Sequence, residues 1–142
     1  MTASAAGSAR VAPRSAVAGI ALAVVAATVA SGIVNFLLSL AAQALGADVS
    51  TVMGLQPQTF LLFTLIGTLV GAIGWQVIRR VTATPSRVLR VLVPVVVVLS
   101  LIPDAWVAVS FSAVGGIALG LMHLVVAAAA VPAYRRFLPL AR

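Results

Sequence analysis

The sequence predicts an all-α protein, a four-transmembrane-helix bundle whose N- and C-termini are both cytoplasmic. Its composition is 63% hydrophobic and only 8% charged, whereas a soluble domain carries roughly 25% charged residues. The apolar residues form runs long enough to cross a bilayer, for which about 20 residues suffice. All nine basic residues are arginines, and they lie in three clusters at the ends of these runs.

The lengths of the runs between arginines predict four helices. No charged residue interrupts the first run, so we expect a helix over residues 15–44. A second helix is expected over 59–79. The next run contains only Asp104 and His123 as acidic or basic residues, and it is long enough for two helices, over 89–109 and 114–135. Ser110 and Ser112 relax the apolarity between them and predict the turn.

The arginines orient this bundle, because basic residues concentrate on the cytoplasmic side of a membrane. With four spans, both termini and the loop from Arg79 to Arg90 share one side. The loop from Gly46 to Gln58 carries Asp48 and no basic residue, so we expect it outside. Arginine without lysine, together with abundant Ala and Val, suggests a bacterial genome and hence a bacterial inner membrane.

The net charge of +7 does not indicate nucleic acid, because no aromatic residues alternate with the arginines. Anionic lipid headgroups at the cytoplasmic arginines are the expected partners. A homo-oligomer or a membrane protein partner is a further possibility.

The membrane domain is expected over residues 14–136, between two cytoplasmic tails. Residues 1–13 are small and polar enough to form a disordered tail, and 137–142 form a short tail at the other end. The alternative for the first run is a cleaved signal peptide, whose apolar core usually has roughly 7–15 residues. Because this run continues past residue 40, we expect it to remain as a helix.

Small residues predict where the helices meet, since membrane helices associate by close packing. The second helix carries a row of such residues on one face: Thr64, Gly67, Thr68, Gly71, Gly74 and Trp75. The fourth helix carries a similar row: Gly116, Gly120, His123 and Ala127. We interpret both rows as contacts within the bundle, and a dimerisation motif at Gly67 and Gly71 is the alternative.

Four other residues receive packing or interfacial roles. Asn35, high on the first helix, is expected to pack against a neighbouring helix. Trp75, Trp106 and Tyr134 lie toward the ends of their helices, which is typical of the aromatic belt at a membrane interface.

The third helix contains Pro94 and Pro103, and each removes one backbone hydrogen bond. Ser100 is near enough to Pro103 to bond the carbonyl group that this proline frees. The bend at Pro103 is either a tolerated kink or a local opening beside Asp104.

Asp104 and His123 are the two residues that a membrane composition does not explain. A carboxylate at mid-bilayer costs about 3 kcal/mol and usually faces the bundle interior with a partner. Counted from the nearest arginine, Asp104, His123, Thr64 and Thr28 all lie roughly 18–22 Å deep. With Ser100 one turn from Asp104, these residues form a candidate polar layer in the membrane.

Within this layer, the Asp104 carboxylate is placed to hold the imidazole of His123 by a hydrogen bond. The pair is then either a structural clasp that fixes helix register or a titrating site, since histidine changes charge near neutral pH. A third interpretation directs Asp104 toward the outer headgroups instead.

The sequence contains no catalytic constellation, so we expect a protein that is not an enzyme, without cofactor or metal. It has no cysteine and one histidine, which leaves too few ligands for a zinc site. A phosphate-binding glycine loop and an HExxH motif are both absent. Two aspartates without glutamate or lysine leave almost no general acid or base.

Two segments, LSLIPDAWV (99–107) and GLMHLVVAAAAVPA (120–133), carry a resemblance to known proteins. The Pro-Asp of the first and the Met-His of the second resemble a family of small four-helix membrane proteins from actinobacteria whose function is unknown. The resemblance covers roughly residues 15–136. It implies an integral membrane protein and supplies no activity or ligand.

Three functional hypotheses remain open at this point. The first is a non-enzymatic membrane scaffold or partner protein. The second is a small proton-linked transporter or channel subunit that uses Asp104 and His123. The third is an outward-facing pocket for a lipid or small molecule beneath the loop from Gly46 to Gln58.

Overall fold

The computed structural model describes residues 16–140. The expected N-terminal tail lies outside these residues, as do Arg10, Arg14 and Arg142. The described chain is helical, and its elements are α1 (Ala16–Ala44), the short 3-10 helix η1 (Met53–Leu55), α2 (Pro57–Val81), α3 (Pro85–Ser110) and α4 (Ala113–Phe137). All four α-helices are long and apolar enough to cross a membrane. The predicted all-α fold with four such helices is confirmed.

The helices α2 and α3 begin earlier than the sequence runs suggested. Each has a proline near its start, Pro57 in α2 and Pro85 in α3. Proline is favoured in the first turn because its missing N–H has no helical partner there in any case. The turn before α4 falls where we expected it, and the Ser112 hydroxyl caps the helix by accepting a hydrogen bond from the Gly115 N–H at 3.0 Å.

The bundle has a basic end, defined here as the end where α2 and α4 finish and α3 begins. Arg79, Arg80, Arg87, Arg90, Arg135 and Arg136 all lie there. The opposite end carries the loop with Asp48. Hydrogen bonds from the Ser50 hydroxyl and the Ser50 N–H lower the pKa of the Asp48 carboxyl below its ordinary value.

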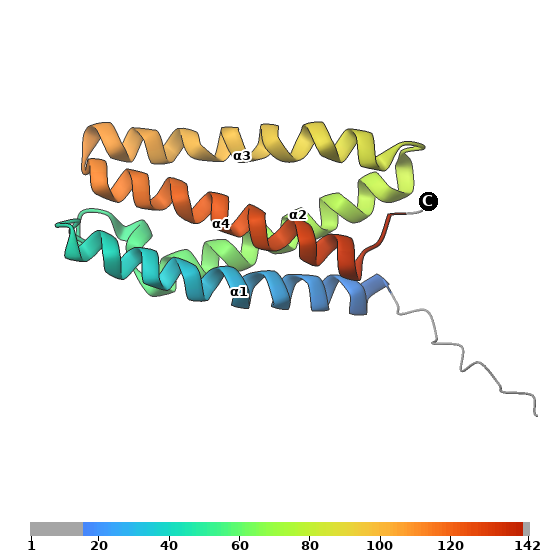
Figure 1. Cartoon of the computed structure of the whole chain (residues 1–142), viewed down its shortest axis with the longest axis horizontal. Coiled ribbons are helices and arrows are strands. Elements are labelled where there is room, and N and C mark those ends of the chain that lie inside the picture. The colour runs from blue at the N-terminus through green and yellow to red at the C-terminus, as the bar shows by residue number, and fades with distance from the viewer. Residues whose placement is uncertain (1–15, 141–142) are drawn as a thin grey trace, which may run out of the picture.

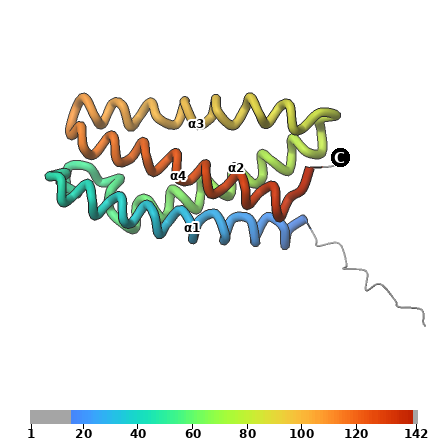
Figure 2. The backbone as a smooth tube through the Cα atoms, in the orientation of Figure 1, coloured from blue at the N-terminus to red at the C-terminus, as the bar shows by residue number. Residues whose placement is uncertain are grey.

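Helix α4 is the centre of the bundle, and α3 is peripheral. α4 packs extensively on α1 and on α3, and it also contacts α2. Figures 1 and 2 show α3 running along α4, away from α1, and approaching α2 only near the turn that joins them. Leu89 and Asp104 are the buried residues of α3. Most of this helix therefore faces outward.

Two apolar clusters form the core. The cluster at the basic end joins all four helices through Ala23, Ala27, Ala72, Trp75, Leu89, Tyr134 and their neighbours. The other cluster lies under the loop that carries Asp48, called here the acidic loop. It contains Ala42, Ala47, Val52, Leu55, Phe60, Ala118 and Met122. These side chains pack beneath the loop, and the outward-facing pocket that we had considered there stays a prediction.

Trp75 and Tyr134 correct one prediction from the sequence. We expected both at the membrane interface, but their exposed fractions are 3% and 5%. The Trp75 Nε1–H donates to the Leu138 carbonyl at 3.0 Å. The centroids of the Trp75 and Tyr134 rings lie 5.6 Å apart. An internal acceptor satisfies the indole N–H, so the ring needs no contact with the interface. Trp106, in contrast, is 65% exposed.

The glycines of α2 do not form a continuous seam in the bundle. Side-chain carbons added at Gly67 and Gly74 would meet nothing within 4 Å. At Gly71, such a carbon would lie 2.7 Å from the Tyr134 hydroxyl oxygen. Of the Gly67–Gly71 pair, Gly71 alone therefore makes room for a neighbouring helix.

Ser100 also differs from our expectation. Pro103 frees the carbonyl of Leu99, four residues earlier. The Ser100 hydroxyl instead donates to the Val97 carbonyl at 2.7 Å. A serine in a helix reaches the carbonyl three or four residues before it, so the Leu99 carbonyl, one residue before Ser100, is out of its reach.

Candidate functional site

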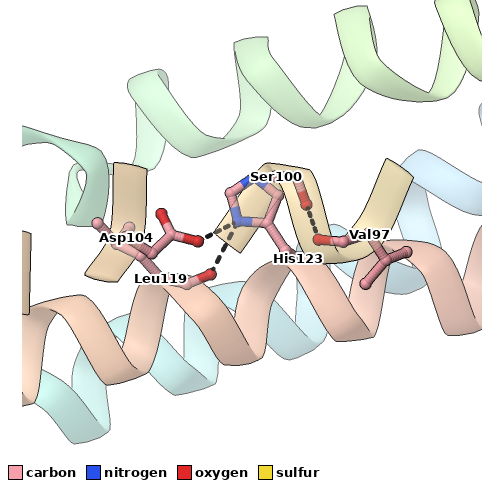
Figure 3. A network of polar contacts seen from close by, with 5 residues as sticks. All are labelled: Val97, Ser100, Asp104, Leu119 and His123. Carbon is pink, nitrogen blue, oxygen red and sulfur yellow. Dashed lines mark hydrogen bonds and ion pairs between the residues drawn. The ribbon is translucent and has the colours of Figure 1, made fainter. Parts of the chain in front are cut away.

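The candidate site is a contact between an aspartate on α3 and a histidine on α4. The Asp104 Oδ2 atom lies 2.7 Å from the His123 Nδ1 atom (Figure 3). The carboxylate side chain is 9% exposed, whereas the imidazole side chain is 43% exposed. The pair therefore has one buried and one accessible member.

The surroundings of Nδ1 determine where the imidazole carries its proton. This nitrogen also lies 3.2 Å from the Leu119 carbonyl oxygen, one turn earlier in α4. An ionised carboxylate and a carbonyl are both acceptors, so their attraction to Nδ1 requires a proton on that atom. The other ring nitrogen, Nε2, then accepts in the neutral ring and donates in the protonated one.

The two acceptors share this proton unequally. The Asp104 Oδ2 atom receives no hydrogen bond with favourable angles, despite its short distance from Nδ1. The contact is thus an ion pair when His123 is protonated, and a close polar contact without a well-aligned hydrogen bond when His123 is neutral.

Close packing of two backbones brings the pair together. At Gly116 of α4, an added side-chain carbon would lie 2.4 Å from the Ala108 backbone nitrogen of α3. Only glycine allows this approach, because a real side chain would collide with the backbone. Ala108 is one turn beyond Asp104, so the seam holds the carboxylate against α4.

A second polar group joins α1, α2 and α4. The Thr28 and Thr68 hydroxyls lie 2.9 Å apart, and the Thr68 hydroxyl also reaches the Leu65 carbonyl at 3.0 Å. The Tyr134 hydroxyl donates to the Thr68 carbonyl at 2.6 Å. Thr64 is buried one turn before Thr68 on α2.

The expected polar layer therefore divides into two groups among the described residues. Asp104 and His123 meet each other, while Ser100 turns back onto α3. Thr28 finds Thr68 rather than joining Asp104. Similar depth along the membrane normal does not place side chains together, because each helix can present its polar residue in a different direction around its axis.

Several buried polar residues lie outside the polar layer that the sequence predicted. Tyr134 was assigned to the interface and Thr68 only to packing, although Thr64 and Thr68 are one turn apart and both buried. Asn35 is completely buried, and neither atom of its amide has a hydrogen-bond partner within residues 16–140. The buried Gln76 amide also has no hydrogen-bond partner within these residues.

The chemistry available to the Asp104–His123 pair is limited. Residues 16–140 contain no cluster of three or more His, Cys, Asp or Glu side chains that would hold a metal ion. The two side chains attract each other, and a proton on the imidazole strengthens that attraction. Holding two helices together and exchanging a proton through the exposed ring are both within its reach.

The fold and this site define a class of protein, a small bundle of four apolar helices that could each cross a membrane, with an acid–base pair between two of these helices. Residues 10–139 match the model of a family of unknown function, DUF6069. The chain belongs to this family, and the resemblance to a family of unknown function is thereby confirmed. The actinobacterial origin of the family stays a prediction. No curated protein and no solved structure matches the chain.

Proposed function

We propose that this protein is a non-enzymatic scaffold or partner protein of a bacterial inner membrane, and that the Asp104–His123 contact is the clasp that holds its outermost helix. The observation that supports the proposal is the position of α3. This helix buries only Leu89 and Asp104 among its residues, so it presents an apolar surface to its surroundings and makes one close polar contact with the bundle.

The clasp fits this role better than a transport path does. A carrier needs a space for solute beside its titrating groups. The Asp104 carboxylate is instead buried against α4, next to the close approach at Gly116. The exposed apolar residues on α3, such as Val98, Leu99 and Ile102, form a surface suited to lipid or to a partner helix.

A double-mutant cycle tests the clasp. Asp104→Asn combined with His123→Gln removes both titrating groups and keeps amides that are able to bond across the seam. For a clasp, each single change lowers the free energy of unfolding in detergent, and the double change restores part of the loss. Contacting pairs usually show a coupling of about 0.5–3 kcal/mol. Additive losses would contradict the clasp. Asp48→Asn is the matched control, since it removes the exposed acid.

A crosslinking experiment tests the partner role. A photoreactive amino acid at Ile102 on the exposed face of α3 is expected to form adducts of discrete mass with another protein in the native membrane. The same probe at Val29 on α1, which is also exposed, serves as the control. If both positions crosslink only lipid, the scaffold proposal loses its support.

The absence of cysteine makes the proposed topology directly testable. A single cysteine at Ala83, between α2 and α3, is expected to resist a membrane-impermeant thiol reagent in intact cells. A single cysteine at Met53 in the acidic loop is expected to react. The reverse pattern would invert the proposed orientation.

One observation favours a second candidate, a proton-linked transporter or channel subunit. The His123 side chain is 43% exposed on the surface of the bundle, so its Nε2 could exchange a proton if water or a polar partner group reaches this depth of the membrane. Proton flux in liposomes that is retained by Asp48→Asn and abolished in a stably folded Asp104→Asn/His123→Gln variant would establish this function in place of the clasp.

A further inference from the structure

A cavity of about 480 Å³ lies at the basic end, between α2, α3 and α4. This volume is within the range of roughly 300–1,000 Å³ that is typical of ligand sites. Its polar lining consists of Ser86 and Arg90 from α3 and Arg135 from α4. Leu89, Val93, Pro94 and Val131 supply much of its apolar wall.

The two arginines of the cavity have no carboxylate partner in the described chain. The sequence contains two acidic residues. Asp48 is bonded to Ser50 and Thr51 in the loop at the opposite end, and Asp104 contacts His123. The guanidinium groups at this cavity are exposed and have no ion-pair partner among the described residues, so they are available to an anion from another molecule.

The floor of the cavity is held in place by α2. Trp75 donates to the Leu138 carbonyl at 3.0 Å, and Arg79 donates to the Pro139 carbonyl at 2.9 Å. These bonds fold the segment after α4 back beneath the bundle, where Pro139 and Leu140 line the cavity. The site is thus built before any ligand arrives, which lowers the entropic cost of binding.

The distribution of polarity identifies the ligand class. Arg90 lies in the second turn of α3 and Arg135 in the last turn of α4, whereas Val93, Pro94 and Val131 lie about one turn further toward the middle of the bundle. An occupant therefore needs an anionic head at the helix ends and an apolar tail along the helices. Inorganic phosphate or another small anion would leave the apolar wall unused.

We infer that this cavity binds one anionic phospholipid, with its phosphate between Arg90 and Arg135 and an acyl chain along Val93 and Val131. Arginine suits this role because its planar guanidinium can donate two parallel hydrogen bonds to phosphate oxygens. The inference rests on the membrane location proposed above, and it is independent of the scaffold role.

Competition between lipids tests the site. The purified protein in nanodiscs of phosphatidylcholine, with increasing phosphatidylglycerol, is expected to retain phosphatidylglycerol selectively in native mass spectrometry. Arg90→Gln/Arg135→Gln is expected to weaken this selectivity at least about tenfold, since a hydrogen bond to a charged group contributes roughly 1.5–3 kcal/mol. The matched control, Arg80→Gln/Arg136→Gln, removes the same charge from positions outside the lining and is expected to retain the selectivity.

A second variant keeps the charges and fills the space. Val131→Trp is expected to abolish selective retention although both arginines remain, so the test does not depend on the double arginine variant folding. Equal weakening by the two arginine pairs would overturn the site, because it would indicate attraction by net charge alone. If inorganic phosphate, at the same concentration as phosphatidylglycerol, competes with this lipid, the phospholipid site is also overturned in favour of a site for a small soluble anion.

The same preparation separates this inference from the proposed location and function. A chain that enters no bilayer of either composition would contradict the membrane location. A chain that enters both bilayers without lipid selectivity would contradict the site alone. Asp104→Asn/His123→Gln is expected to retain phosphatidylglycerol, because the clasp is far from the cavity along α3, and loss of retention in this variant would contradict a separate site.

Discussion

Gly116→Ala is the single substitution that most directly tests the seam between α3 and α4. The added carbon would lie 2.4 Å from the Ala108 nitrogen and 2.5 Å from the Ala108 Cβ, whereas ordinary contact begins at 3.4 Å. The neighbour at the closest point is backbone, which has no alternative rotamer. The two helices must therefore separate by about 1 Å at this level.

The cost of this separation has three components. Overpacking a close contact costs about 1–3 kcal/mol. The shift also lengthens the 2.7 Å contact of Asp104 with His123, since Asp104 is one turn from Ala108, and an interhelical polar contact is worth roughly 0.6–1.7 kcal/mol. The higher helix propensity of alanine returns up to about 1 kcal/mol. We expect a net loss of about 1–4 kcal/mol in the free energy of unfolding.

Gly67→Ala is the matched control, because it makes the same chemical change where no atom lies within 4 Å. It is expected to leave stability unchanged or to raise it by up to about 1 kcal/mol. Steric trapping or unfolding in mixed micelles measures both variants on one scale. If Gly116→Ala is as stable as the unmodified chain, or if Gly67→Ala is equally destabilised, the close approach of α3 and α4 is not where the structure places it.

Three further predictions concern other polar groups. Tyr134→Phe removes the donor to the Thr68 carbonyl and is expected to lower the free energy of unfolding in detergent by about 0.6–1.7 kcal/mol; no loss would contradict that bond. Asn35→Leu replaces a buried amide without partners by a side chain of similar volume. It is expected to raise stability by about 1 kcal/mol, and destabilisation would indicate a polar contact at Asn35. Ser50→Ala is expected to raise the pKa of Asp48 toward 3.8, as measured by carbon NMR of the carboxyl group. The stabilisation from ionised Asp48 is present above its unfolded-state pKa and is lost as the pH falls through its lower folded-state pKa. A carboxyl titration that Ser50→Ala leaves unchanged would refute the hydrogen bond from the Ser50 hydroxyl.

The helices were predictable from the sequence because their signal is simple. Uncharged runs bounded by arginines leave little choice about which segments are helical, and Ser110 and Ser112 marked the last turn. The early starts at Pro57 and Pro85 were missed because proline was treated only as a helix breaker. Both prolines lie just after a polar residue at the edge of an apolar run, and this pattern was available in the sequence.

The directions in which side chains point were much less predictable. In a soluble helix, a polar stripe marks the outer face, but a helix in lipid is apolar on both its inner and outer faces. Gly67 and Gly71 illustrate the difficulty, since both seemed to belong to one seam and only Gly71 meets a neighbour. Trp75 and Tyr134 were misplaced for a related reason: their position along the axis suggested an interface, and their bonds to Leu138 and Thr68 were not visible in the sequence.

The peripheral helix α3 links the two proposals made here. Its contact with α4 at Asp104 and the cavity at Arg90 lie fourteen residues apart, or about 21 Å along the helix axis. Both sites bridge α3 to α4, through His123 in one case and Arg135 in the other. Leu89 already packs into the core at the basic end, so α3 is attached by an apolar contact near its start and by the clasp near its end. A phospholipid in the cavity would add a polar bridge between α3 and α4 beside Leu89, and the outward surface of α3 would then have a more firmly defined orientation toward the proposed partner.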